Sequence, residues 1–314
     1  MIHMSDMMML RRAADEIKHS VIGKDDIIIK ILMTICAGGH ILLEDIPGVG
    51  KTTIAVAFSK ALGLAYNRMQ FTSDVLPADV TGFNIPDRST GKFLFKPGAV
   101  FCNLFLADEI NRTSSKTQSA LLECMEEHTV TVDGMTRELP KPFIVLATQN
   151  PSGSAGTQML PESQLDRFMI RLSIGYPKVE DEAAILKAKA NRQGPPPVEK
   201  IMSAEDIIRL RAAAHDIHSS DEIFDYIARI SAATRNDRRL ELGVSPRGSI
   251  AVAKMARCTA MFKGRDYVIP DDVRFVYADV CAHRVIAAKK PKATDEEVRA
   301  IVNDIAASVP APKV

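Results

Sequence analysis

Hydrophobic residues in the first 177 positions gather in short, nearly continuous runs, and stretches with helical periodicity lie among these runs. The runs predict β-strands at 40–44, 65–71, 103–107, 143–147 and 169–174. The periodic stretches predict helices that include 13–20, 26–37 and 51–62. Apolar strands that alternate with helices are typical of a parallel sheet covered on both faces. The pattern therefore predicts an α/β fold with a parallel sheet between helices.

Two further segments of this region are predicted to form β-hairpins. The first, 82–97, contains a turn sequence at 89–92 between its two arms. The second, 128–139, alternates between apolar and polar residues and turns at Asp133-Gly134. An Asp-Gly pair between alternating residues is a strong hairpin signal. Both hairpins are expected to extend from the sheet-containing domain.

The pattern changes after Tyr176-Pro177, where helical periodicity continues without a convincing strand. The segment Gly194-Pro195-Pro196-Pro197 predicts a rigid break between helices. Helices are predicted at 204–218, at 220–234, at 249–262 and from Pro270 onward. The sequence thus predicts two domains, a sheet-containing domain at 1–177 and a smaller all-helical domain at 178–314.

Composition and charge restrict the classes of function. The chain has 314 residues, of which 46% are hydrophobic and 25% charged, and its formal net charge is +1. A near-neutral chain without Trp has no general electrostatic basis for binding nucleic acid or acidic membranes. The apolar residues at 7–10 are too few for a signal peptide, and no segment reaches membrane-spanning length. The five Cys residues include no C-x-x-C pair, and several lie among apolar neighbours and are expected in the core, which favours a reducing, cytoplasmic location.

The most informative motif lies between the strand at 40–44 and the helix at 51–62, where residues 45–53 read DIPGVGKTT. A glycine-rich loop that ends at a helix N-terminus directs backbone N–H groups toward an anion. The loop and first helical turn therefore predict a phosphate site made by Gly48, Val49, Gly50, Lys51, Thr52 and Thr53. Lys51 can reach the outer phosphates of a nucleotide, and the Thr52 hydroxyl can bind Mg²⁺. Asp45 stands where the motif has its first glycine, and Asp tolerates a tight turn better than most residues.

Two acids follow the apolar strand at 103–107. Asp108 at the strand end can hold Mg²⁺ or its waters. Glu109 points in a different direction and can polarise an attacking water. The plainer interpretations are a strand that ends in a solvated acidic turn, and a chance Gly-Lys-Thr at the loop. The occurrence of both motifs in one chain favours a site for a nucleoside triphosphate.

Further motifs make the chain similar to the MoxR family of AAA+ ATPases. They occur in family order and span nearly the whole chain: ADEINR at 107–112, KTQSALLE at 116–123, MEE at 125–127, ATQNP at 147–151, LPESQLDRF at 160–168 and GVSPR at 243–247. The resemblance implies an AAA+ P-loop NTPase core followed by an all-helical lid domain. It implies ATP and Mg²⁺ as cofactors and hydrolysis of ATP as the reaction.

The resemblance also assigns candidate catalytic residues. Asn150 resembles the sensor-1 residue that places the attacking water; the plainer interpretation is an Asn-Pro turn. Arg167 resembles the arginine finger that is offered to the ATP of a neighbouring subunit. Arg171 is the alternative finger, but it lies in a strand pattern. Arg247 resembles sensor 2, which reaches the γ-phosphate from the lid domain.

For Arg167, a surface arginine paired with Asp166 or Glu162 remains the simpler interpretation. Ile22 and Gly23 resemble the segment on the adenine side of the nucleotide. The two hairpins match inserts that face a central pore or a partner in this family. The resemblance implies a ring, expected to be a hexamer, a client protein that is remodelled or activated, and a partner with a von Willebrand factor A domain.

Other interpretations remain open. An AAA+ motor or loader acting on nucleic acid is the main alternative, and the near-neutral charge argues against it. A nucleotide switch without hydrolysis does not need Glu109 or Arg167, and a small-molecule kinase does not need the two inserts. No Asn-Lys-x-Asp motif supports a GTPase. His215 and His218 stand three apart on a predicted helix and could bind a metal, and the lysines at 289–292 could touch phosphate, but solvated surface explains both.

Overall fold

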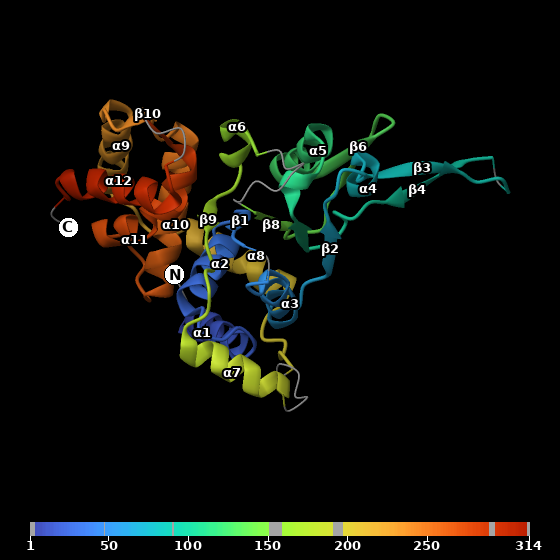
Figure 1. Ribbon diagram of the computed structural model, residues 1–314, viewed down its shortest axis with the longest axis horizontal. Helices are drawn as coiled ribbons and strands as arrows, with labels where there is room; N and C mark the ends of the chain where they lie inside the picture. Colours follow the sequence, from blue (N-terminus) through green and yellow to red (C-terminus); the bar gives the residue numbers. More distant parts are fainter. Residues whose placement is uncertain are drawn as a thin grey trace.

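A five-stranded parallel sheet lies at the centre of the first domain in the computed structural model (Figure 1). The structure describes residues 4–46, 48–89, 91–150, 159–190, 197–288 and 293–312. The strand order is β2 (Tyr66–Gln70), β5 (Leu104–Asp108), β8 (Ile144–Gln149), β1 (Ile41–Glu44) and β9 (Ile170–Leu172). Every neighbouring pair is parallel, which confirms the predicted fold class.

The described helices of the first domain are α1 (Met4–Ser20), α2 (Asp25–Cys36), α3 (Lys51–Ala61), α4 (Pro77–Thr81), η1 (Ile110–Arg112), α5 (Ser115–Glu127) and α6 (Glu162–Leu165). Alternate residues of β1 divide between two apolar clusters. Ile41 and Leu43 join the cluster that contains α1, α2 and α3, whereas Leu42 joins the cluster that contains α5. Successive side chains of a strand point to opposite faces, so the two clusters cover the two faces of the sheet.

The predicted lid, which is the chain after residue 177, contains the helices α7 (Val179–Ala190), α8 (Ala204–His215), α9 (Asp221–Asn236), α10 (Pro246–Phe262), α11 (Pro270–Cys281), η2 (Ala282–Arg284) and α12 (Asp295–Ser308). Helices α9 to α12 gather at one end of the molecule in Figure 1. Buried residues of α8 to α12 belong to the same apolar cluster as α1 to α3, so the core continues from the sheet into the lid. The predicted boundary at residue 177 remains a prediction.

The structure corrects three predictions in detail. Helix α1 begins at Met4 rather than at residue 13, and buried Leu10 anchors it. The lid contains a short antiparallel pair, β10 (Leu240–Leu242) with β11 (Ile286–Ala287), where no strand was predicted, because such short strands show no period. Helix α8 ends at His215, so His218 lies outside it and forms a bridge with Tyr267. The lysines at 289–292 and the break at 194–196 lie outside the described residues.

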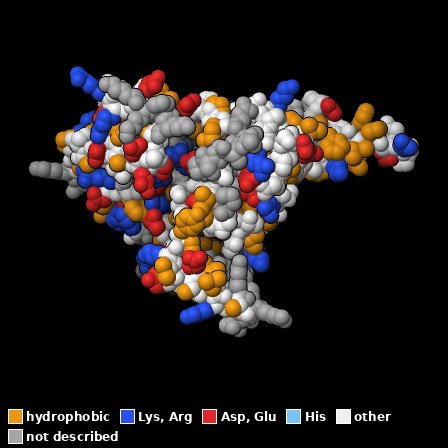
Figure 2. Space-filling view, in the orientation of Figure 1, with side chains coloured by type: hydrophobic (Ala, Val, Ile, Leu, Met, Phe, Trp, Pro, Cys, Tyr) orange, Lys and Arg blue, Asp and Glu red, His pale blue; other side chains and the backbone are white. Residues whose placement is uncertain are grey.

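Both predicted hairpins are present, as β3 (Gly82–Pro86) with β4 (Phe93–Pro97) and β6 (Thr129–Val132) with β7 (Met135–Glu138). The β3–β4 hairpin projects as an arm from the body of the molecule (Figure 1). Asn84 of the arm donates a hydrogen bond to Asp133 in the turn of the second hairpin at 2.7 Å. Phe93 and Leu94 are 74% and 66% exposed, and Figure 2 shows apolar side chains along the arm. The arm thus exposes apolar side chains to solvent.

All five cysteines are free and buried, which confirms the core position predicted for several of them. None of the helices in the described part of the chain is long and apolar enough to cross a membrane.

His40, directly before β1, connects three elements of the first domain. Its Nδ1 accepts a hydrogen bond from the Val145 N–H of β8 at 2.9 Å, and its Nε2 donates to the Met125 carbonyl of α5 at 3.0 Å. This pattern requires the neutral ring with its proton on Nε2. Burial lowers the pKa of His40 to about 3.

We expect this buried neutral histidine to make the fold sensitive to acid. Below pH about 6.5 the unfolded state binds a proton that the folded state does not, so the free energy of unfolding decreases as the pH is lowered. The slope from His40 reaches about 1.4 kcal/mol per pH unit and continues down to the folded pKa. His40→Gln should reduce the slope between pH 6 and 4 in urea unfolding, whereas the exposed His215→Gln should not. Equal slopes for both variants and the parent would contradict this role.

Candidate functional site

The loop between β1 and α3 has the backbone geometry of an anion site. Gly48 and Gly50 have φ values of 91° and 97°, which L side chains rarely adopt. No atom lies within 4 Å of the position that a Cβ would take at either glycine, so the loop faces open space. Lys51, Thr52 and Thr53 form the first turn of α3 directly after it. The described residues of the loop therefore fit the phosphate cradle that the sequence predicts; Pro47 lies outside them.

Asp45, at the position of the missing first glycine, ties this loop to the chain that follows β9. Its side chain is buried. Oδ1 accepts the Ile46 N–H at 2.9 Å, and Oδ2 accepts the Ser173 hydroxyl at 3.0 Å and the Gly175 N–H at 2.7 Å. An aspartate can bridge these groups and a glycine cannot, so the departure from the motif has a structural cause that the sequence did not reveal.

Lys24 also binds the chain that follows β9. The Lys24 ammonium donates to the carbonyls of Ile174, Gly175 and Tyr176 at 2.7, 3.2 and 3.0 Å. Residues 173–176 connect β9 to α7, so they lead from the sheet into the lid. Asp45 and Lys24 together fix this connection beside the phosphate loop.

Lys51 lies among acidic groups at the carboxyl end of the sheet. Its ammonium donates to the backbone carbonyl of Asp45. Burial lowers the pKa of Lys51, and the nearby carboxylates of Asp45, Asp108 and Glu109 oppose this shift. The predicted phosphate-binding lysine and the two predicted acids are thus brought into one electrostatic environment.

Thr148, at the end of β8, links the two acids. Its hydroxyl donates to Asp108 Oδ1 at 2.7 Å and accepts the Glu109 N–H at 2.8 Å. The φ of Glu109 is 56°, so this contact supports a backbone conformation that is uncommon for a non-glycine residue. Sequence reasoning missed Thr148. The signal that could have identified Thr148 was its position: it lies two residues before Asn150, at the end of a strand adjacent to β5.

Each acid has a second partner from the described residues around β2 and η1. Arg68 donates to Asp108 Oδ2 at 2.8 Å. Gln70 and Arg112 donate to Glu109 Oε2 at 2.8 and 2.7 Å. These contacts hold the Glu109 carboxylate at the edge of the site, where it can accept a proton from a water molecule.

The donor set suits magnesium bound through a nucleotide. Asp108 and Thr52 offer oxygen ligands, which Mg²⁺ prefers. Within the described ranges no group of three His, Cys, Asp or Glu side chains could hold a metal alone. Mg²⁺ usually keeps waters and takes substrate phosphates as ligands beside one or two protein groups. Thr52 and Asp108 therefore fit Mg²⁺ that arrives with phosphates.

The remaining candidates on this edge lie in turns. Gly23 has a φ of 72° between α1 and α2, and an added Cβ would lie 2.0 Å from the Asp181 carboxylate of α7. The chain at Ile22 and Gly23 therefore packs closely against the start of α7. Asn150 follows β8, and its carbonyl accepts a hydrogen bond from the Asn111 side chain at 3.2 Å. Their roles toward a nucleotide remain predictions.

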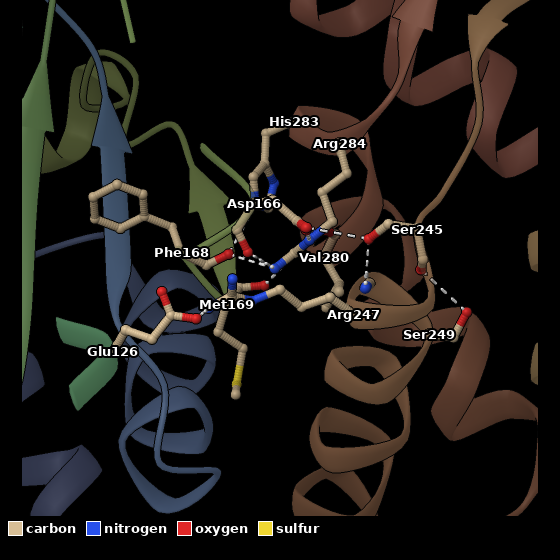
Figure 3. Close-up of polar contacts among 11 residues, drawn as sticks. Glu126, Asp166, Phe168, Met169, Ser245, Arg247, Ser249, Val280, His283 and Arg284 are labelled. Atoms are coloured by element: carbon tan, nitrogen blue, oxygen red, sulfur yellow. Dashed lines mark hydrogen bonds and ion pairs between the residues drawn. The ribbon is translucent and has the colours of Figure 1, made fainter. Parts of the chain in front are cut away.

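Arg167 and Arg247 meet at the opposite edge of the sheet. Arg167 precedes β9, and the neighbouring Met169 N–H donates to the His40 carbonyl directly before β1. Arg167 donates to the Leu122 carbonyl at 2.8 Å, and both arginines form ion pairs with Glu126 at 3.2 Å (Figure 3 shows Glu126 with Arg247). Arg167 does not pair with Asp166 or Glu162, the partners of the simpler interpretation.

Arg171 lies inside the junction between sheet and lid. Its guanidinium pairs with Glu44 at 2.9 Å and with Asp295 of α12, and its side chain is 14% exposed. An arginine engaged in this way is less able to reach another molecule than Arg167, whose side chain is 30% exposed. The geometry therefore favours Arg167 over Arg171 as the candidate finger.

Comparisons with known proteins point in the same direction. Residues 40–170 match the ATPase family associated with various cellular activities (AAA), and residues 232–305 match the AAA lid domain. The Mycobacterium tuberculosis protein named Chaperone MoxR1 is 38% identical over 97% of this chain and 83% of its own length. The Bacillus subtilis protein YeaC, which is named as uncharacterised, is 44% identical over 97% of this chain and 95% of its own length. The structure of a candidate ATPase from Cytophaga hutchinsonii has a TM-score of 0.90 at 36% identity and covers 98% of this chain and 96% of its own.

We expect Asp45→Ala to lower the free energy of unfolding by about 2 kcal/mol, because hydrogen bonds to a charged group contribute about 1.5–3 kcal/mol and their donors would lose their acceptor. Ser173→Ala removes only one of these bonds and should cost about half as much. Urea unfolding of both variants tests the difference. If Asp45→Ala cost no more than Ser173→Ala, the bridge would not stabilise the loop.

Proposed function

The chain belongs to the MoxR family of AAA+ ATPases, and we propose that it hydrolyses Mg-ATP at a site shared between neighbouring copies and uses the cycle to remodel a client protein. One observation carries the proposal. The phosphate loop and the two acids lie at the carboxyl ends of the parallel strands, whereas Arg167 and Arg247 lie at their amino ends.

This separation supports a site with contributions from two copies. Strands rise about 3.3 Å per residue, so strands of three to six residues separate the two edges by on the order of 10–20 Å. We infer that Arg167 acts on a phosphate bound to another copy rather than on one bound at Lys51 of its own copy. In a ring built from head-to-tail contacts, the edge with Arg167 faces the loop of the next copy. We propose a hexamer.

On the loop side, Lys51 and the N–H groups at the start of α3 would bind the phosphates. Thr52 and Asp108 would hold Mg²⁺, and bound Mg-ATP supplies the phosphoryl group that water attacks. Glu109 would take a proton from that water, and Asn150 would help to orient it. Thr148 holds the Glu109 backbone in place, and Gln70 holds its carboxylate.

On the opposite edge, Arg167 and Arg247 would act on the neighbour's phosphates. Two guanidinium groups match the charge that spreads over the transferring phosphoryl oxygens. Glu126 pairs with both arginines in the single chain. We expect the nucleotide of the neighbour to replace Glu126 as their partner when the ring assembles.

The β3–β4 arm is the proposed contact with the client. It carries the exposed side chains of Phe93 and Leu94 and is linked to the second hairpin through Asn84 and Asp133. The name of the relative Chaperone MoxR1 supports a chaperone-like output. The family resemblance adds a partner with a von Willebrand factor A domain to the proposal.

We expect Glu109→Gln to bind ATP as tightly as the parent chain and to hydrolyse it at least about 100-fold more slowly, since general acid–base groups contribute about 10²–10⁴ in rate. Calorimetry measures the binding and phosphate release measures the turnover. Glu205→Gln, an exposed change on α8, is the control and should keep both. Unchanged turnover in Glu109→Gln would remove Glu109 from this role.

The shared site is tested by mixing two inactive variants. Lys51→Ala has no functional phosphate loop but keeps its arginines. Arg167→Ala keeps the loop but lacks the arginine offered to the neighbour. In equal mixtures about a quarter of the contacts between copies combine an intact loop with an intact arginine, so activity should return. A mixture no more active than either variant alone would argue that each copy works by itself.

A further inference from the structure

Arg284 of the lid holds the segment that carries Arg167 (Figure 3). Its side chain is 2% exposed and comes from η2. It donates to the carboxylate of Asp166 at 2.6 Å and to the backbone carbonyls of Phe168, Met169 and Asp166 at 2.6, 3.0 and 3.1 Å. One guanidinium thus binds the chain on both sides of Arg167.

Neighbouring residues are arranged around this contact. His283 adds a hydrogen bond between its Nε2 and the Phe168 carbonyl at 3.0 Å. Gly248 leaves room for Arg284, because a Cβ there would lie 3.0 Å from Arg284 Cδ. The described residues offer Arg284 one carboxylate, Asp166, as its ion-pair partner. A buried guanidinium depends strongly on such a partner, so this contact has little freedom to shift.

The same aspartate reaches the element that carries Arg247. Asp166 Oδ2 accepts the Ser245 hydroxyl at 3.2 Å. Ser245 is the N-cap of α10, and its Oγ accepts the Gly248 N–H at 3.1 Å. Arg247 lies in the first turn of that helix. Asp166 therefore connects Arg284 to both arginines, to Arg167 through the adjacent peptide and to Arg247 through the helix cap.

We propose that Arg284 is a positioning residue that sets Arg167 and Arg247 in one geometry for the active site of the neighbouring copy. The inference rests on the proposed shared site. Arg284 belongs to the lid, and the segment that it binds belongs to the sheet domain. A change in the position of the lid is thereby passed to Arg167, and the two arginines move as a unit.

Arg284→Lys tests this role. Lysine keeps the charge but lacks the planar fork that binds several acceptors at once. We expect kcat for ATP to fall roughly 10- to 100-fold, since a displacement of about 1 Å costs up to about 10² in rate. The affinity for ATP should stay within about twofold, because the loop side is untouched. Asp166→Asn breaks the same link from the other side and should give the same kcat-specific loss.

Mixing experiments separate positioning from a simple loss of structure. Arg284→Lys copies keep an intact loop and Glu109, and Glu109→Gln copies keep well-placed arginines. A mixture should therefore regain activity well above either variant alone, as should a mixture of Arg167→Ala with Glu109→Gln. A copy that is generally damaged cannot regain activity from its neighbour.

Arg299→Lys is the matched control. Arg299 also joins lid and sheet domain, because it pairs with Asp279 of α11 and donates to the Arg171 carbonyl of β9, but it does not contact residues 166–169. We expect Arg299→Lys to lose about as much thermal stability as Arg284→Lys but to keep the kcat of the parent chain. If the Arg167→Ala mixture regains activity and the Arg284→Lys mixture does not, Arg284 acts within its own copy and the inference is wrong. If neither regains activity, the shared site itself is wrong, and the inference falls with it.

Discussion

The direction of the parallel strands is the constraint on which the rest of this molecule depends. All strands of the central sheet end at the same edge, so the phosphate loop after β1, the acids at the end of β5 and Thr148 on β8 must meet there. The segment that enters β9 must lie at the other edge, and it carries Arg167. The two sets of residues therefore lie at opposite edges of the sheet within one copy. We propose that the site is for this reason divided between copies.

Each edge is joined to the lid by an aspartate with several hydrogen bonds. On the loop side, Asp45 binds Ser173 and Gly175 in the connection that leads to α7. On the arginine side, Asp166 binds Arg284 and Ser245. The continuous apolar core of the sheet and the lid makes these contacts parts of one packed unit. A change at the phosphate loop can thus reach the lid, and a change in the lid can reach Arg167 and Arg247, which we propose to act on the next copy.

Much of this arrangement was predictable from sequence because it depends on local patterns. Apolar runs predicted the sheet, and short motifs located Lys51 at the start of the helix after β1 and Asp108 and Glu109 at the end of β5. The contacts that depend on distant parts of the chain were not predictable. Thr148 and Arg284 lie far in sequence from the groups that they bind, as do Ser173 and Gly175 from Asp45, so no spacing reveals these contacts. The strands β10 and β11 were missed because two or three residues carry no periodic signal.

The most direct test of the shared site is the dependence of ATP hydrolysis on protein concentration, measured together with light scattering for the size of the assembly. If a neighbouring copy completes each site, activity per copy should rise as assemblies form and approach zero when dilution leaves single chains. Constant activity per copy down to concentrations at which scattering detects only single chains would contradict the account.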